Sequence, residues 1–124
     1  MKELTTADAP DSIGPYSQGV VSGDKLYVSG QGPVDPETGE VVDGTPAEQT
    51  MRTLENVEAI LEAGGSSLAD VVKATVFLKD MRYYDEVNEV YGEYMSAPYP
   101  ARSAVEVVKL PVDIDVEIEV VAER

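Results

Sequence analysis

One amphipathic helix is predicted for residues 45–65, which read TPAEQTMRTLENVEAILEAGG. Thr45 can cap the helix and Glu48 can return the capping bond, while Pro46 suits the first helical position. The glycine pair at 64–65 is typical of a helix end. Apolar side chains recur at the spacing of one helix face, namely Met51, Leu54, Val57, Ile60 and Leu61. Both ends and one buried face of a helix are therefore marked in this stretch.

Strand-like segments lie on both sides of that helix, and a hairpin signal at residues 22–24 joins two of them. The expected strands are 2–6, 16–21, 25–31, 71–79, 102–108 and 114–122. A second amphipathic helix is expected over 84–95, where Gly92 weakens it and Pro98 and Pro100 end it. The order ββ(β)-α-β-α-β-β predicts an α+β fold, a single mixed sheet with two helices packed on one face.

The chain is expected to form one domain, residues 1–124, because this length supports one core and no linker or repeat interrupts it. Two helices cover only one face of a sheet, yet both faces are expected to carry apolar residues. Those on the last two strands are Val105, Val107, Val116, Ile118 and Val120. The uncovered face therefore predicts that copies of the chain associate through their sheets.

Composition excludes several classes of protein. The chain has no cysteine and no histidine, which removes disulfides, thiolate nucleophiles, His-based triads and His/Cys zinc sites. The remaining option is an all-carboxylate site, but no EF-hand spacing is present, and no metal is expected. Nine basic residues against 24 acidic ones give a net charge of −15, which argues against nucleic-acid and anionic-membrane partners. Without a membrane-spanning run or signal segment, the expected location is the cytoplasm.

The acidic residues are spread along the chain rather than gathered in a tail. They can form a cation-binding surface, or they can reflect a salty cytoplasm in which screening tolerates a dense surface charge. The charges follow exposed helix and strand faces, which favours the second interpretation. We therefore expect a halophilic protein that folds best at high salt.

Arg102 attracts attention because basic residues are scarce in this chain. It lies in PARSAVEV, residues 100–107, and DVEIE, residues 115–119, follows on the next expected strand. A guanidinium can hold the carboxylate of a small organic acid by two hydrogen bonds, and a carboxylate beside it can transfer protons. The residues alone are equally compatible with a structural salt bridge of Arg102. An active site is thus one of two interpretations of these segments.

Motifs along the whole chain resemble, in order, those of the RidA (YjgF) family. They are IGPYSQG at 13–19, VSGQGP at 28–33, NVEAILEAGG at 56–65, VKATVFLKD at 72–80, VNEVY at 87–91, PARSAVEV at 100–107 and VEIE at 116–119. A single motif would carry little weight, but this many in register do not arise by chance. The length of the chain also agrees with the family.

The resemblance implies a chorismate-mutase-like fold that assembles as a homotrimer, with the sheets forming an inner barrel, the helices outside and three clefts between subunits. It also implies hydrolysis of 2-imino acids (2-iminopropanoate, 2-iminobutanoate and their enamine tautomers) to 2-oxo acids and ammonia, without a cofactor. These imines arise when PLP enzymes eliminate water from serine or threonine. The implied partner is therefore a small 2-imino or 2-oxo acid.

The family pattern also assigns roles to individual residues. Arg102 would bind the substrate carboxylate, Glu117 would direct the hydrolytic water and Tyr16 would line the cleft, so these three are the implied catalytic residues. The implied substrate-binding residues, besides Arg102, are Ser29, Gly30, Asn88 and Ala104. Without the resemblance, Glu117 is best explained as a solvated charge. For Tyr16, a packing role is nearly as well supported as a role in the cleft.

Two positions depart from the family pattern. Ala104 stands where many relatives have cysteine, so a backbone carbonyl remains for the substrate but no thiol is available for a redox-triggered chaperone role. Gly32 is smaller than the apolar residue often found there, and we expect it to widen the pocket.

Two functions are compatible with this pattern. One is an imine deaminase that protects PLP enzymes from reactive intermediates. The other is a non-catalytic, small-carboxylate-binding protein with a regulatory or chaperone-like role, which would use Arg102 but would not need Glu117. RNA cleavage, an older claim for the family, fits poorly because the chain has no histidine and no basic groove is expected.

Overall fold

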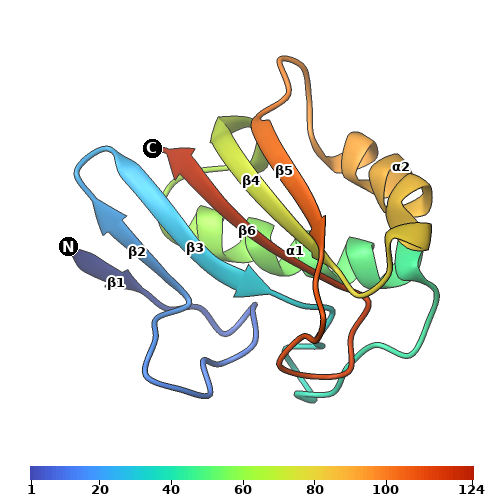
Figure 1. Ribbon diagram of the computed structural model, residues 1–124. Coiled ribbons are helices and arrows are strands. Elements are labelled where there is room, and N and C mark those ends of the chain that lie inside the picture. The colour runs from blue at the N-terminus through green and yellow to red at the C-terminus, as the bar shows by residue number, and fades with distance from the viewer.

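The fold consists of one six-stranded sheet and two helices in a computed structural model that describes residues 1–124 (Figure 1). The strands are β1 (Lys2–Leu4), β2 (Gly19–Ser22), β3 (Lys25–Gln31), β4 (Val71–Leu78), β5 (Ala101–Glu106) and β6 (Val116–Glu123). Their order in the sheet is β1-β2-β3-β6-β4-β5, and only the β4–β5 pair is parallel. The predicted α+β class and mixed sheet are confirmed.

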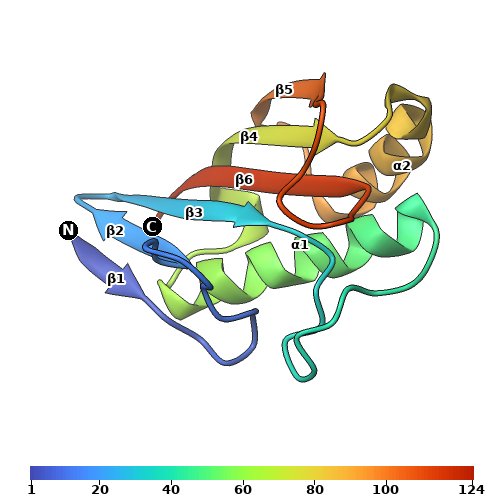
Figure 2. The ribbon, with the colours of Figure 1, turned by 60° about the horizontal axis from the view of Figure 1, so that its bottom comes forward.

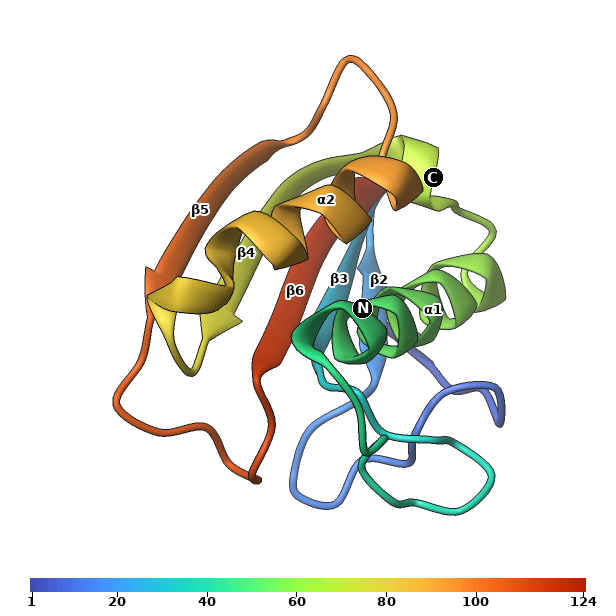
Figure 3. The ribbon, with the colours of Figure 1, turned by 90° about the vertical axis from the view of Figure 1, so that its right-hand side faces the viewer.

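Both helices lie on the same face of the sheet, as Figures 2 and 3 show. They are α1 (Pro46–Ala63) and α2 (Tyr84–Tyr94), and short 3₁₀ turns, η1 (Leu68–Asp70) and η2 (Met81–Tyr83), precede β4 and α2. The predicted arrangement of two helices on one face is therefore correct. Neither helix has the combination of length and apolar character that a membrane span requires.

Helix α1 begins with the predicted capping box. The Thr45 hydroxyl accepts the Glu48 N–H at 3.2 Å, and the Glu48 carboxylate accepts the Thr45 N–H at 3.1 Å. The predicted apolar face is wrong in one member, because the Met51 side chain is 41% exposed. Polar residues share the buried face instead, namely Gln49, Thr50, Thr53 and Asn56. Gln49 and Asn56 bind the backbone of neighbouring loops, whereas the Thr50 hydroxyl donates to the Pro46 carbonyl of the same helix. A purely apolar pattern therefore does not describe this face.

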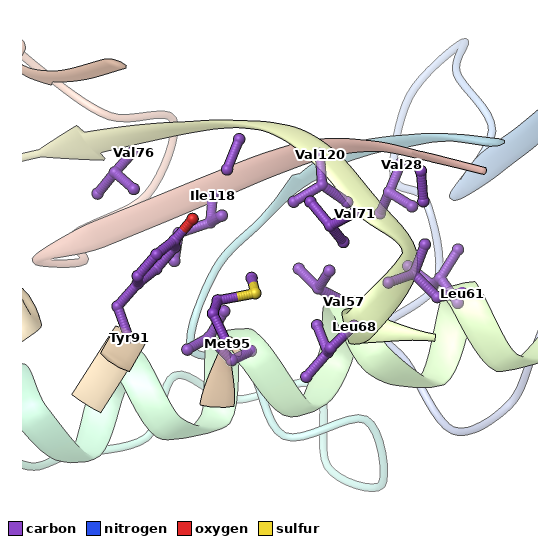
Figure 4. Packing of buried hydrophobic residues seen from close by; sticks show 14 of the residues in the cluster. Val28, Val57, Leu61, Leu68, Val71, Val76, Tyr91, Met95, Ile118 and Val120 are labelled. Atoms are coloured by element: carbon purple, nitrogen blue, oxygen red, sulfur yellow. The ribbon is translucent and has the colours of Figure 1, made fainter. Parts of the chain in front are cut away.

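The hydrophobic core fills the space between the helices and the sheet (Figure 4). Alternation along β6 turns Val116, Ile118 and Val120 toward the helices, where all three are buried. These three residues therefore belong to the covered face and contribute nothing to the open one. The strand pairing groups another apolar set on the open face, namely Val20, Tyr27, Phe77, Val105 and Val121. The open face thus carries apolar area, as predicted, but mostly from other residues.

Strand β1 ends earlier than the sequence predicts because the Gln18 side chain binds the segment that follows β1 and holds it as a loop. Its buried amide donates to the carbonyls of Thr6 at 3.1 Å, Ala9 at 3.2 Å and Pro10 at 2.8 Å. Its Oε1 accepts the Thr6 N–H at 2.8 Å. Backbone groups that bind a side chain in this way do not pair in a ladder, so β1 ends at Leu4 instead of residue 6. Strand β2 begins at Gly19, three residues later than predicted. The other elements differ from prediction by small shifts of their ends.

Asn56 ties α1 to the segment after β3, which generates a stability prediction. The fully buried amide donates to the carbonyls of Gly32 at 3.1 Å and Val34 at 2.8 Å, and its Oδ1 accepts from Arg52 at 2.9 Å. Asn56→Ala should lower the free energy of unfolding by about 2–4 kcal/mol, because buried partners lose their bonds. Urea unfolding measures this, with the exposed Glu62→Ala as control. Equal midpoints for the two variants would contradict the role of the amide.

Candidate active site

A cavity of about 510 Å³ lies at one end of the sheet and is walled mainly by three loops. Figure 1 shows these loops below the sheet: the segment before β2, the segment between β3 and α1, and the segment between β5 and β6. The apolar part of the lining comes from Ile13, Val34, Val41, Val112 and Ile114. Three of the predicted site residues, Tyr16, Gly30 and Glu117, also line it. The cavity thus combines apolar walls with the Tyr16 phenol and three carboxylates, those of Asp11, Glu37 and Glu117.

Glu117 lies against the backbone of Gly30. The pairing of β3 with β6 shifts between Val28 and Gln31, so β3 has an irregularity where it faces β6. A Cβ atom on Gly30 would lie 2.9 Å from Cδ of Glu117, and closer still to its Oε2. Glycine at this position is therefore what leaves room for the carboxylate.

The Glu117 carboxylate is half-buried and forms no ion pair or hydrogen bond within the chain. Burial raises its pKa above the ordinary value, and repulsion by Glu119 adds to the shift. A carboxyl group with a raised pKa exchanges protons closer to neutral pH than a solvated one. Its position and environment suit proton transfer to a molecule in the cavity.

Tyr16 and Ser29 contribute differently to this half of the site. Tyr16 is exposed to the cavity, and its hydroxyl accepts the Ile13 N–H at 3.4 Å. Ser29 uses both of its donors within the chain: its hydroxyl donates to the Ser17 carbonyl at 2.6 Å and its N–H donates to the Gln18 carbonyl at 2.9 Å. Ser29 therefore anchors the Tyr16 loop, and its predicted contact with substrate gains no support from these bonds.

Arg102 lies on the edge strand β5 and faces α2. Its Nη2 donates to the Tyr84 hydroxyl at 3.2 Å, and its Cζ lies 4.7 Å from the ring centre of Tyr91 and 5.7 Å from that of Tyr84. The ion pairs of the chain involve other basic residues, namely Lys25, Arg52, Lys79 and Arg82. The alternative interpretation of Arg102 as a structural salt bridge is therefore wrong within the chain.

Asn88 and Ala104 lie near Arg102 rather than near the cavity. Ala104 is two positions along the same strand, on the same face, and packs against the core. Asn88 is half-buried on α2 and shares a helix face with Tyr84 and Tyr91. Arg102, Ala104 and Asn88 thus form a second group of predicted site residues.

The two groups lie on opposite faces of the sheet. Arg102 pairs with the buried Ala74 of β4, whereas Glu117 pairs with Phe77 of the same strand, three residues on. Residues an odd number of positions apart point to opposite faces. The expectation that a carboxylate from the next strand lies beside Arg102 is therefore wrong for one chain, because β4 also separates β5 from β6.

The expected widening at Gly32 is absent. A Cβ atom at Gly32 would lie 2.9 Å from Cδ1 of Ile114, so the isoleucine fills the space that a larger residue would occupy. The cavity wall is closed there by a side chain from the loop before β6.

Sequence comparison shows where this chain belongs. Residues 6–124 match the family model described as Endoribonuclease L-PSP, and two of the solved structures that the chain resembles carry the names RidA and YjgF. The chain is a member of the RidA/YjgF family. A RutC family protein of Pyrococcus horikoshii is 54% identical over 123 residues, which cover 98% of each chain.

Two Escherichia coli proteins of the RidA/YjgF family are also informative. The 2-iminobutanoate/2-iminopropanoate deaminase of strain K12 is 47% identical over 126 residues, covering 99% of this chain and 98% of that one. The crystal structure of TdcF with bound serine superposes with a TM-score of 0.94 at 43% identity, covering 100% of this chain and 99% of that one. The α+β fold is thus that of solved RidA-family structures.

Several residues that shape the site escaped prediction. Gln18 and Asn56 position two of the cavity loops, and Tyr84 holds Arg102. The only sequence signal for Gln18 and Asn56 is that a polar residue stands among residues expected to be buried. That signal does not identify the backbone groups that the side chain binds. For Tyr84 and Tyr91, the sequence signal is their position on one face of the second predicted helix, which allows them to share a partner.

A double-mutant cycle tests the contact between Gly30 and Glu117. Gly30→Ala should lower the free energy of unfolding by about 1–3 kcal/mol, because the added methyl group and the carboxylate need the same space. In a Glu117→Ala background most of this cost should disappear, since the space is then empty. Thermal and urea unfolding of the four proteins measure the coupling. Equal costs in both backgrounds would show that the two residues do not compete for space.

Proposed function

We propose that this chain is a cofactor-independent imine deaminase, which hydrolyses 2-iminopropanoate, 2-iminobutanoate and their enamine tautomers to 2-oxo acids and ammonia. The observation that carries the proposal is the unpaired Glu117 carboxylate beside Gly30 in a cavity shared with Tyr16. The 47% identity to the E. coli deaminase supports the same reaction. The cellular consequence would be protection of PLP enzymes from the reactive intermediates that they release.

A second copy of the chain completes the site in this proposal. Arg102 and Glu117 point to opposite faces of one sheet, so a guanidinium beside the cavity has to come from a neighbour. The open sheet face offers area for such contact, because Tyr27 is 45% and Val105 is 41% exposed there. The family resemblance implies a homotrimer with three clefts, and these observations are consistent with that assembly.

Substrate binding in this scheme uses both groups of residues. Arg102 would bind the substrate carboxylate through two N–H groups, and the Gly30 backbone would approach the same carboxylate from the other subunit. The serine bound in the crystal structure of E. coli TdcF supports a ligand with such a carboxylate. The Ala104 carbonyl would accept the imine N–H and favour the electrophilic imine over the enamine.

Glu117 would transfer the protons of the reaction. As water adds to C2, Glu117 takes one of its protons, the C=N electron pair moves to nitrogen, and nitrogen receives that proton. Glu117 then takes the proton of the new hydroxyl group and passes it to the amine nitrogen, which becomes the leaving group. The C–N bond breaks, ammonia leaves and C=O forms, so one imine and one water give one 2-oxo acid and one ammonia. A positioned acid/base group of this kind contributes about 10²–10⁴-fold.

Turnover can be tested with an amino-acid oxidase that generates the imine while semicarbazide traps it. The wild type should suppress semicarbazone formation, and Arg102→Ala should lower kcat/KM by about 100-fold, because a bidentate ion pair is lost. Glu117→Gln should bind 2-oxobutanoate but lose turnover. The exposed Arg82→Ala serves as control. If the folded wild type binds 2-oxobutanoate without suppressing the semicarbazone, the chain is a small-carboxylate-binding protein instead.

Subunit complementation tests where the site is assembled. Arg102→Ala and Glu117→Gln chains are each expected to be inactive, but refolding them together should restore activity. On random mixing about one quarter of the sites would pair an intact Arg102 with an intact Glu117 from a neighbour. Activity that stays at the level of the separate variants, in mixed assemblies verified by mass, would rule out a site between subunits.

A further inference from the structure

The guanidinium of Arg102 is held by two tyrosines rather than by a carboxylate. The chain contains 24 acidic residues, yet none forms an ion pair with Arg102. Its neighbours are instead the Tyr84 hydroxyl at 3.2 Å and the Tyr91 ring, whose centre is 4.7 Å from Cζ. Both tyrosines belong to α2, which packs over this end of the sheet (Figure 3). In so acidic a chain, it requires an explanation that the groups around the Arg102 guanidinium are uncharged.

The two tyrosines restrain the guanidinium in different ways. Tyr91 is only 6% exposed, and its hydroxyl has no hydrogen-bond partner, so its ring is the part that contacts Arg102. Figure 4 shows the Tyr91 side chain directed from α2 toward the sheet. A ring face restrains the guanidinium plane through cation–π attraction. The Tyr84 hydroxyl accepts one N–H and fixes the direction in which the group points.

This arrangement leaves the binding capacity of Arg102 almost intact. A guanidinium has five N–H donors, and the side-chain bond to Tyr84 uses one. A carboxylate in the place of Tyr84 would neutralise the charge and compete with an incoming anion. Two neutral tyrosines fix the group while its charge remains available, and a group fixed in advance loses less entropy when a ligand binds.

We propose that Tyr84 and Tyr91 are positioning residues that orient the Arg102 guanidinium to receive the substrate carboxylate. The identity of that ligand rests on the proposed deaminase function, whereas the restraint on the guanidinium does not. Tyr84 and Tyr91 act through Arg102 and touch neither C2 nor the imine nitrogen. Their effect therefore belongs to substrate binding rather than to the chemical step.

Kinetics should separate these roles. Tyr84→Phe is expected to raise KM about fivefold, the loss typical of one hydrogen bond, and to leave kcat within about twofold. Tyr91→Leu removes the ring face and should raise KM further, by about tenfold. The control is Tyr94→Phe, because the Tyr94 hydroxyl contacts Glu55 at 3.5 Å and does not reach Arg102. A fall in kcat with unchanged KM for Tyr84→Phe would overturn the proposal.

Two further measurements do not depend on turnover. Calorimetric titration with 2-oxobutanoate should show the same fivefold loss of affinity for Tyr84→Phe. Nitrogen-15 relaxation of the Arg102 side chain should show faster guanidinium rotation in Tyr84→Phe than in the wild type and Tyr94→Phe, at unchanged melting temperature. If rotation increases but no imine is hydrolysed, the positioning role stands and the deaminase function fails. If rotation, affinity and KM all match the wild type, Tyr84 does not position Arg102.

Discussion

The alternation of side chains along β6 is the constraint on which the rest of the structure depends. Val116, Ile118 and Val120 form the floor of the core beneath both helices, which leaves Glu117 and Glu119 on the other face. Because β6 is flanked by β3 and β4, a shift of its register by one residue would bury carboxylates among Leu and Val side chains. Core packing and the position of the candidate acid/base group are therefore set by the same strand.

Local signals predicted most of the fold. The cap at Thr45, the glycine pair at 64–65 and the alternation along each strand are local signals. Each depends on residues only a few positions apart in the sequence, so pattern analysis detects them. The position of β6 between β3 and β4 is not local, and sequence order alone placed Glu117 beside Arg102. Likewise, the three carbonyls that bind Gln18 are several residues away and carry no pattern of their own. The predictions failed where a contact depends on topology or on one buried polar side chain.

The candidate site was predicted as a set of residues but not as an arrangement. Resemblance to the family implied a single site for all of the predicted residues, but only Tyr16, Gly30 and Glu117 line the cavity. The resemblance did not show that Arg102 faces the helices. The face on which Arg102 lies depends on the register of β5 against β4 and of β4 against β6, which motifs do not contain. The family model carries an endoribonuclease description, yet a chain without histidine and with a net charge of −15 provides neither the usual acid/base side chain nor attraction for RNA.

The contact between Gly30 and Glu117 also limits how this sequence can change. The space that a side chain at position 30 would fill is already occupied by the carboxylate of residue 117. A family member can therefore keep a long acidic residue at 117 or acquire a side chain at 30, but not both without moving a strand. Substitutions at positions 30 and 117 should therefore be coupled. Divergent relatives that have a side chain at 30 and a shorter residue at 117 would be those that have lost this geometry.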